Sequence, residues 1–88
     1  MDNKRVALIG IIVEKFESAE RVNSVLHEYG SYVIGRMGIP YREREISIIS
    51  VAVDAPQSII SALSGKLGMI DGVHSKTIYS KNSGEEKS

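Results

Sequence analysis

Two segments of the chain, residues 6–13 and 46–53, are apolar at nearly every position. The first contains no polar side chain, and only Ser47 and Ser50 interrupt the second. Successive side chains of a strand point to opposite faces of a sheet, so a strand with one solvated face alternates between apolar and polar residues. Both faces of these two strands are therefore predicted to be covered. Because 88 residues supply little more than one covering layer, we expect the second cover to be another copy of the chain.

The composition narrows the class of protein. Eleven basic and eleven acidic side chains cancel, and the sequence pI is about 6.7. Proteins that bind nucleic acids usually carry a basic excess, so direct nucleic-acid binding is not expected. The chain has no cysteine, which excludes disulfides, thiolate metal sites and iron–sulfur ligation. Neither a signal peptide nor an apolar run of roughly 20 residues is visible. We therefore expect a soluble, cytoplasmic protein with no membrane partner.

Two helices are predicted from the spacing of apolar residues. In the first, residues 19–29, apolar side chains recur every three or four positions after Ser18, a typical N-cap residue. Gly30 is placed where a left-handed residue would end this helix. The second helix is predicted to begin with Asp54 as N-cap, in a capping box with Gln57, and to end at Gly68.

The remaining strands are predicted at residues 32–39 and 73–79, with Pro40 ending the former and Asp71–Gly72 forming the turn before the latter. The resulting order is β-α-β-β-α-β, which is typical of the ferredoxin-like α+β fold: a four-stranded antiparallel sheet with both helices on one face. Right-handed crossovers place segments 6–13 and 46–53 at the centre of that sheet.

A single domain is predicted over residues 1–80, followed by a disordered polar tail at 81–88. The face of the sheet without helices is where a second copy would bind, as a dimer or a tetramer. The pattern leaves open whether Leu8 and Ile12 or Ile9 and Ile11 point to that face, because both sets are apolar. As interface residues we predict Ile9, Ile11, Ile48 and Gly35.

Three segments resemble one known family. Residues 25–43 contain an Arg-x-Gly-x-Pro-x-Arg-Glu motif at 36–43, residues 46–51 are apolar, and residues 61–73 contain Ala-Leu-Ser-Gly-Lys-Leu-Gly at 62–68. The combination resembles the iron-only hydrogenase system regulators, which are ferredoxin-like proteins related to ACT domains and to the C-terminal domain of the nickel-responsive regulator. The likeness covers residues 5–81 without visible gaps.

This resemblance implies a regulatory role in an iron-only hydrogenase system and self-association through the sheet, and it names no ligand. Together with the two apolar strands, it predicts a homo-oligomeric regulatory domain that binds a small effector. No DNA-binding segment precedes residue 6, and the histidine-and-cysteine ligand set of the nickel relatives is missing, so neither DNA binding nor a cofactor is expected. The alternative is a protein-interaction subunit that docks on a hydrogenase maturation or regulatory protein without any small ligand.

Two clusters are candidates for an effector site. Gly38 and Tyr41 lie among the arginines Arg36, Arg42 and Arg44, whose guanidinium groups could bind a carboxylate or another anion. The alternative interpretation is a solvated hairpin in which neighbouring glutamates, Glu43 and Glu45, neutralise the arginines. The second cluster is the turn containing Glu14, Lys15 and Phe16, which corresponds, by the resemblance alone, to the effector-binding turn of ACT-like domains.

Metal binding and catalysis have weaker support. His27 and His74 could form a metal site only if Glu28 or Asp71 converged with them, and the alternative is two separate exposed histidines. The sequence lacks a cysteine nucleophile and a G-x-S-x-G elbow, and its paired carboxylates lie in polar stretches that would not raise a pKa. We therefore predict neither a metal site nor an enzyme.

Overall fold

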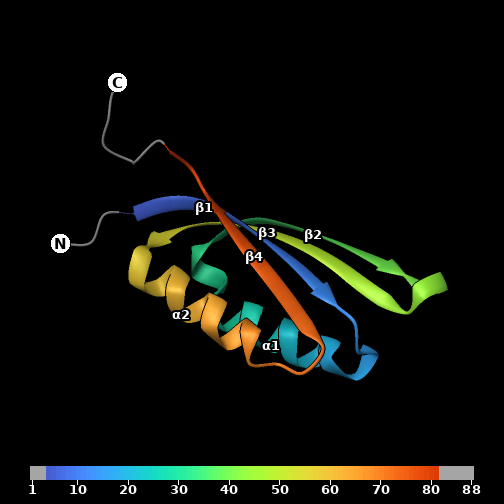
Figure 1. Ribbon diagram of the computed structural model, residues 1–88. Coiled ribbons are helices and arrows are strands. Elements are labelled where there is room, and N and C mark those ends of the chain that lie inside the picture. The colour runs from blue at the N-terminus through green and yellow to red at the C-terminus, as the bar shows by residue number, and fades with distance from the viewer. Residues whose placement is uncertain (1–3, 82–88) are drawn as a thin grey trace.

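The computed structural model describes residues 4–81, which form an α+β fold (Figure 1). Short 3₁₀ turns precede α1, follow it, and close the hairpin between β2 and β3. The predicted tail, residues 81–88, lies outside the described residues except for Lys81. The helices and strands are β1 (Lys4–Val13), α1 (Ala19–Glu28), β2 (Val33–Tyr41), β3 (Ile46–Pro56), α2 (Gln57–Gly68) and β4 (Val73–Tyr79).

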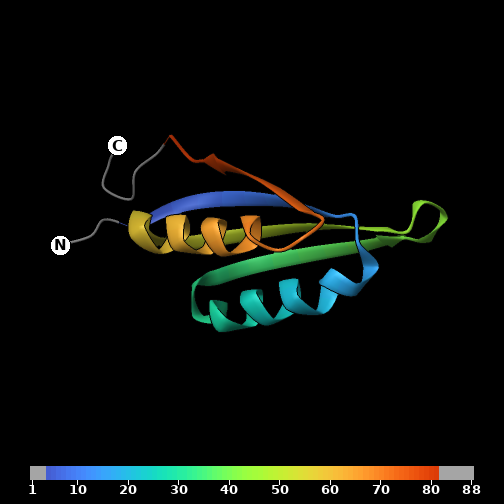
Figure 2. The same cartoon turned by 60° about the horizontal axis from the view of Figure 1, so that its bottom comes forward.

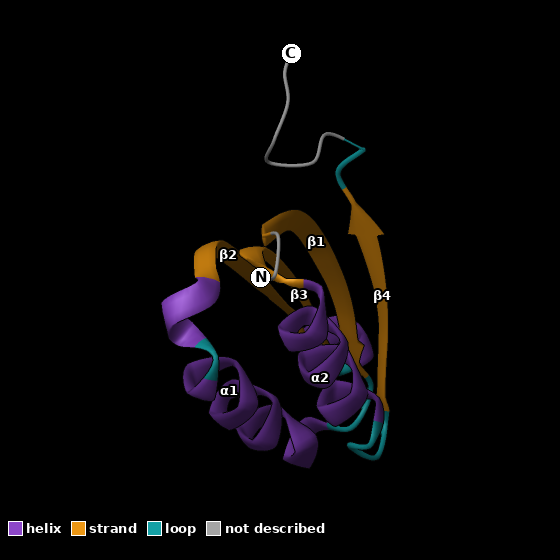
Figure 3. Ribbon diagram, turned by 90° about the vertical axis from the view of Figure 1, so that its left-hand side faces the viewer, coloured by secondary structure: helices purple, strands orange, loops and turns teal. Residues whose placement is uncertain are grey.

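The four strands form one sheet in the order β2-β3-β1-β4. All three pairs of neighbouring strands are antiparallel, and both helices lie on the same side of the sheet (Figures 2 and 3). The predicted ferredoxin-like fold is therefore confirmed, and the two apolar strands, β1 and β3, occupy its centre. No helix within residues 4–81 has the length and the apolar character needed to cross a bilayer.

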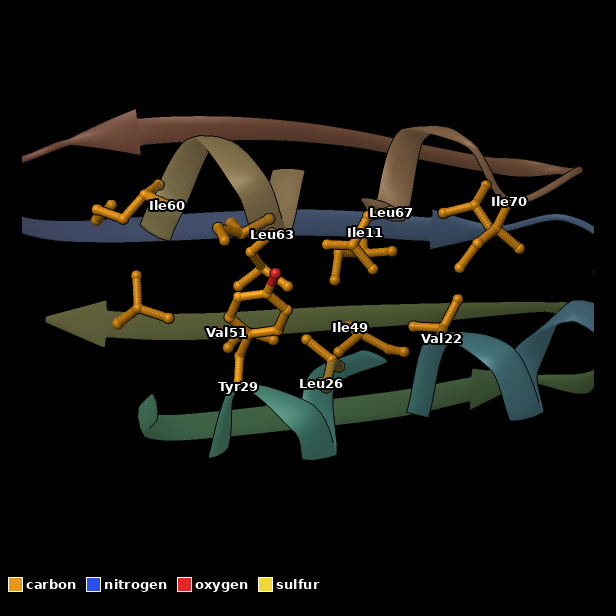
Figure 4. Close-up of a cluster of buried hydrophobic side chains, with 14 of the residues drawn as sticks. Ile11, Val22, Leu26, Tyr29, Ile49, Val51, Ile60, Leu63, Leu67 and Ile70 are labelled. Atoms are coloured by element: carbon orange, nitrogen blue, oxygen red, sulfur yellow. The ribbon is translucent and has the colours of Figure 1, made fainter. Parts of the chain in front are cut away.

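The hydrophobic core lies between the sheet and the two helices (Figure 4). Alternate residues of β1 and β3 point into it, and the helices contribute apolar side chains at helical spacing. Full burial of an aliphatic side chain of this size stabilises the fold by about 1.5–3 kcal/mol. Among the largest side chains that are completely buried are Ile9, Ile11, Val51, Val22, Ile60, Leu63 and Leu67.

The burial pattern decides which side chains of β1 point away from the helices. Ile9 and Ile11 are 0% and 1% exposed, so their predicted place in an oligomer interface is wrong: the helices of the same chain already cover them. The opposite set faces outward, and Leu8 is 44% exposed. Ile48 and Gly35 belong to this outward side, because Ile48 pairs with Ile12 and Gly35 pairs with Ala52, and directly paired residues share a face.

The outward side of the sheet, which we call the open face, carries large apolar residues from all four strands. Each of these side chains is between 37% and 67% exposed. The register of the neighbouring strands places all of them on the face away from the helices. Contiguous exposed apolar patches on soluble domains are typical of interaction surfaces. The large exposed residues of the open face are Val6, Leu8, Met37, Ile39, Tyr41, Ile48 and Ile78.

The boundaries of several elements differ from the prediction, and β1 begins already at Lys4. β3 continues to Pro56 because Asp54 and Ala55 pair with β1, so α2 begins only at Gln57 and Asp54 does not cap it. β2 runs through Pro40 to Tyr41. A proline is tolerated there because β2 is an edge strand, whose outward N–H groups have no partner strand.

The two predicted caps of α1 also differ. Ser18 is at the N-cap position but makes no capping hydrogen bond; its hydroxyl bonds to the carbonyl oxygen of Asp71 at 2.6 Å instead. At the other end Tyr29 is the C-cap residue, and Gly30 begins a 3₁₀ turn without a positive φ. Long-range contacts and the following turn therefore replace the local capping that the residue types favour.

Candidate functional site

A cleft of about 500 Å³ lies between the end of the β2–β3 hairpin and the turn that follows β1. The hairpin projects beyond the helices (Figure 2). Five apolar or aromatic residues line the cleft, Val13, Phe16, Pro40, Tyr41 and Ile46, together with three polar ones, Arg42, Glu45 and Ser47. We call it the hairpin cleft. Its volume and its mixture of an apolar wall with a few polar groups are typical of small-molecule sites.

The end of the hairpin has an unusual backbone. Arg42–Arg44 form a 3₁₀ turn, and Glu45 closes it with φ 56° and ψ 40°, in the left-handed region. The Glu45 N–H donates to the Arg42 carbonyl at 3.1 Å. Among residues 4–81, Glu45 is the one non-glycine residue with a positive φ. This conformation costs an L-residue roughly 1–2 kcal/mol, and such strain is concentrated at functional sites.

Replacing Glu45 with glycine is expected to raise the free energy of unfolding by about 0.5–1 kcal/mol, because the relief of left-handed strain exceeds the added entropy of the unfolded glycine chain. Urea denaturation followed by circular dichroism measures this change. Glu43→Gly, in the 3₁₀ turn of the same hairpin, is the matched control and should be destabilising by a similar amount. A loss of stability in Glu45→Gly would contradict the strain argument.

The turn after β1 is tied to the loop between α2 and β4. Lys15 Nζ donates to Asp71 Oδ2 at 2.6 Å, and His74 Nε2 lies 3.0 Å from Glu14 Oε1. The backbone N–H of Glu14 donates to the Gly72 carbonyl at 2.7 Å. The hydrogen bond with Lys15 lowers the pKa of Asp71, and the same bond raises the pKa of Lys15. These contacts hold the turn that carries Phe16 in place beside the cleft.

Replacing Gly72 with alanine is expected to lower the free energy of unfolding by about 1–3 kcal/mol. Gly72 has a φ of 78°, and an added Cβ would lie 2.6 Å from Lys15 Cγ. Thermal and urea unfolding measure the loss. Gly68→Ala provides the comparison, since its Cβ would meet nothing within 4 Å and alanine is the better helix former. Equal stability of the two variants would argue against a constrained turn at Gly72.

The structure brings together three of the seven predicted ligand-binding residues. Phe16, Tyr41 and Arg42 line the hairpin cleft, although they come from two clusters that the sequence kept apart. Lys15 bonds instead to Asp71 in the loop before β4, and Glu14 lies against His74 of β4. Arg36 donates from Nη2 to Asn23 Oδ1 on α1 at 2.9 Å, and Gly38 pairs with Ile49 inside the ladder; neither lines the cleft.

Sequence reasoning missed the other residues of the cleft, of which Glu45 is the most informative. The sequence suggests Glu45 only as a residue that neutralises the neighbouring arginines. In the part of the chain that the structure describes, neither Glu43 nor Glu45 forms an ion pair with an arginine. A left-handed glutamate has no sequence signature. Of the remaining lining residues, Val13, Ile46 and Ser47 fall in predicted strands, and Pro40 is predicted only to end one.

The histidines do not converge on a shared site. His27 lies exposed on α1, and His74 lies on β4 beside Glu14. The carboxylates that would complete a metal site have other partners: Glu28 accepts from Lys66 at 2.8 Å and Asp71 accepts from Lys15. Across the described residues, no three histidine, aspartate or glutamate side chains are grouped so that they could hold a metal ion.

The fold and the cleft together define a class: a ferredoxin-like domain with a ligand-sized cleft and an apolar open face. A search of curated proteins finds no match. The family of TM1266-like proteins, described as "Iron-only hydrogenase system regulator, putative", matches residues 5–77. The chain therefore belongs to this family, which confirms the resemblance found in the sequence, and the family is described as one of regulators.

Solved structures agree with this assignment. The uncharacterised protein TM1266 from Thermotoga maritima is 42% identical, with a TM-score of 0.84 over 89% of this chain and 99% of that one. Two others are 14% identical and show the fold alone. A formyltetrahydrofolate deformylase from Pseudomonas putida KT2440 has a TM-score of 0.60, over 82% of this chain and 28% of that one. A nitrogen regulatory PII-like protein from Thiomonas intermedia K12, bound to ADP, AMP and bicarbonate, has a TM-score of 0.51 over 91% of this chain and 92% of that one.

Proposed function

We propose that this chain is a homo-oligomeric regulatory domain of an iron-only hydrogenase system, that it binds a small effector, and that its copies assemble through the open face. The regulatory role rests on the family description. The observation that carries the assembly is the open face itself, on which seven large apolar side chains from four strands remain 37–67% exposed. The effector-binding part is supported by the hairpin cleft.

The energetics favour self-association through this face. Burying the exposed remainder of each half-buried aliphatic side chain stabilises a complex by about 1 kcal/mol. With six such side chains from each copy, Tyr41 not counted, the total lies in the upper part of the association cost of about 4–15 kcal/mol. A second copy is the partner that the charge favours, because the formal net charge of the chain is zero and two copies therefore do not repel one another.

Analytical ultracentrifugation tests the assembly directly. At about 10 µM, a concentration at which a micromolar complex is largely formed, we expect the wild-type protein to sediment as a dimer or a larger oligomer. A stable monomer at this concentration would refute assembly through the open face. In that case the alternative function, a subunit that docks on another protein of the hydrogenase system, becomes the better explanation of the apolar surface.

The regulatory role needs a separate experiment in the native organism. Deleting the gene should change the level of hydrogenase transcript or of hydrogenase activity, and expression of the wild-type chain should restore it. Unchanged transcript and activity under hydrogen-producing conditions would count against a regulatory function, whatever the oligomeric state. The two measurements therefore test assembly and the regulatory role independently of one another.

A further inference from the structure

We propose that the hairpin cleft binds a small zwitterion with an apolar body. Arg42 would bind its carboxylate, Glu45 would bind its ammonium group, and the apolar body would pack against Phe16 and Tyr41. This inference rests on the effector-binding part of the proposed function and names its ligand class. An apolar α-amino acid is the simplest molecule of this class.

The first argument is the charge of the cleft. Arg42 and Glu45 both line it, and within residues 4–81 neither side chain has a hydrogen bond or an ion pair. In the adjoining turn the charged groups are paired, Lys15 with Asp71 and Glu14 with His74. One free cation and one free anion complement a ligand that carries both charges. A polyphosphate or a divalent cation would meet one matching charge and one repelling charge.

The second argument is the apolar wall. Phe16 is 81% exposed and Tyr41 is 41% exposed, so both retain apolar surface that a ligand can cover. Val13 and Ile46 complete the wall. Covering apolar surface contributes affinity in proportion to the area removed from water, and aromatic side chains provide large contact areas. The wall therefore favours a ligand with an aliphatic or aromatic body over a purely polar one.

The third argument is independent of the other two and concerns the backbone. Glu45 has the left-handed conformation that a glycine would adopt at lower cost, and it is also the residue that supplies the negative charge of the cleft. Strained residues persist where the surrounding structure maintains them and are concentrated at ligand sites. A carboxylate at this position is thus explained by what it binds rather than by what it contributes to folding.

The test is a titration of ¹⁵N-labelled protein, followed by amide chemical shifts, with four probes. L-phenylalanine and L-leucine carry both charges, 3-phenylpropionate carries only the carboxylate, and 2-phenylethylamine carries only the ammonium group. We expect saturable shifts at residues of the cleft with the two amino acids and a dissociation constant of about 1 mM or lower. The single-charge analogues should bind about tenfold or more weakly, the usual loss for one hydrogen bond to a charged group.

Four matched variants locate the site. Arg42→Gln and Glu45→Gln should each weaken L-phenylalanine binding about tenfold or more. Glu43→Gln and Arg44→Gln remove the same charges from the same turn, but these residues do not line the cleft, so they should change the affinity less than about twofold. The amide spectrum of each variant reports whether it is folded, so a lost site is distinguished from a lost fold.

Three results would overturn the inference. The first is the absence of saturable shifts at about 10 mM amino acid, a concentration well above the weakest expected dissociation constant. The second is equal binding of 3-phenylpropionate and L-phenylalanine. The third is a set of shifts that is confined to the open face. Sedimentation of the same samples separates this failure from that of the proposed function. If the oligomer persists while no probe binds, the ligand class is wrong and assembly through the open face stands.

Discussion

Replacing Leu8 with lysine is expected to convert the protein into a folded monomer. Leu8 lies on the central strand β1, between Ala52 of β3 and Ile78 of β4, and its side chain is 44% exposed on the open face. In a monomer the new ammonium group remains in water. In an assembled oligomer it would be buried against apolar side chains without a partner, which costs several kcal/mol. We expect the dissociation constant to rise about 100-fold or more, as measured by sedimentation equilibrium.

Two further substitutions make this result interpretable. Ala62→Lys adds the same charge on an exposed position of α2, on the helical side of the molecule, and should leave the oligomer unchanged. Ile9→Lys places the charge at a position that is 0% exposed, and should unfold the chain. If the Leu8→Lys protein keeps both its fold and its wild-type mass, the open face is not the interface.

Truncation of a buried leucine of the core is expected to have a large effect on stability. Leu67→Ala should lower the free energy of unfolding by about 2–5 kcal/mol, because truncation of a buried leucine removes transfer free energy and leaves a cavity. Leu67 is 0% exposed and belongs to the core cluster drawn in Figure 4. Since small domains are stable by only about 5–15 kcal/mol, a substantial share of the total would be lost. Urea denaturation measures it as a lower midpoint with an unchanged m-value.

Met69→Ala serves as the control for this truncation. Met69 lies two residues further along the chain, at the end of α2, and is 86% exposed. Shortening it should therefore change the stability by no more than about 0.5 kcal/mol. A comparable loss in both variants would show that the end of α2, rather than the burial of Leu67, determines the result. A loss well below about 1 kcal/mol in Leu67→Ala would contradict the assigned core.

The sequence predicted the fold because local patterns and long-range requirements agree in this chain. Strands β1 and β3 are the two most apolar segments of the chain, and the crossover rule places the same two segments at the centre of the sheet. The strand ends were less accurate, because they depend on pairing between distant residues. Asp54 is a good capping residue in isolation, but Ala55 pairs with Arg5 across the sheet, and that ladder continues β3 beyond the predicted start of the helix.

The orientation of β1 and most of the cleft could not be predicted, for two physical reasons. Ile9 and Leu8 are equally apolar, so only the position of the helices determines which of them is buried. The cleft depends on the path of the chain at the hairpin end, where Glu45 adopts a backbone conformation that its residue type disfavours. Phe16 is a candidate through the family resemblance alone and Arg42 through the arginines around it, but their meeting in one site is a property of the tertiary structure.

Tyr41 belongs to two surfaces at once: it lines the hairpin cleft and, paired with Ile46 at the end of β2, it is the last large side chain of the open face. A molecule that holds this ring in one rotamer will alter the contour presented to a neighbouring subunit. Thermodynamic linkage makes the influence mutual, so association would change ligand affinity by the same factor. With both the proposed assembly and the proposed ligand site in place, this one aromatic side chain would convert the concentration of a small ligand into a change of quaternary structure.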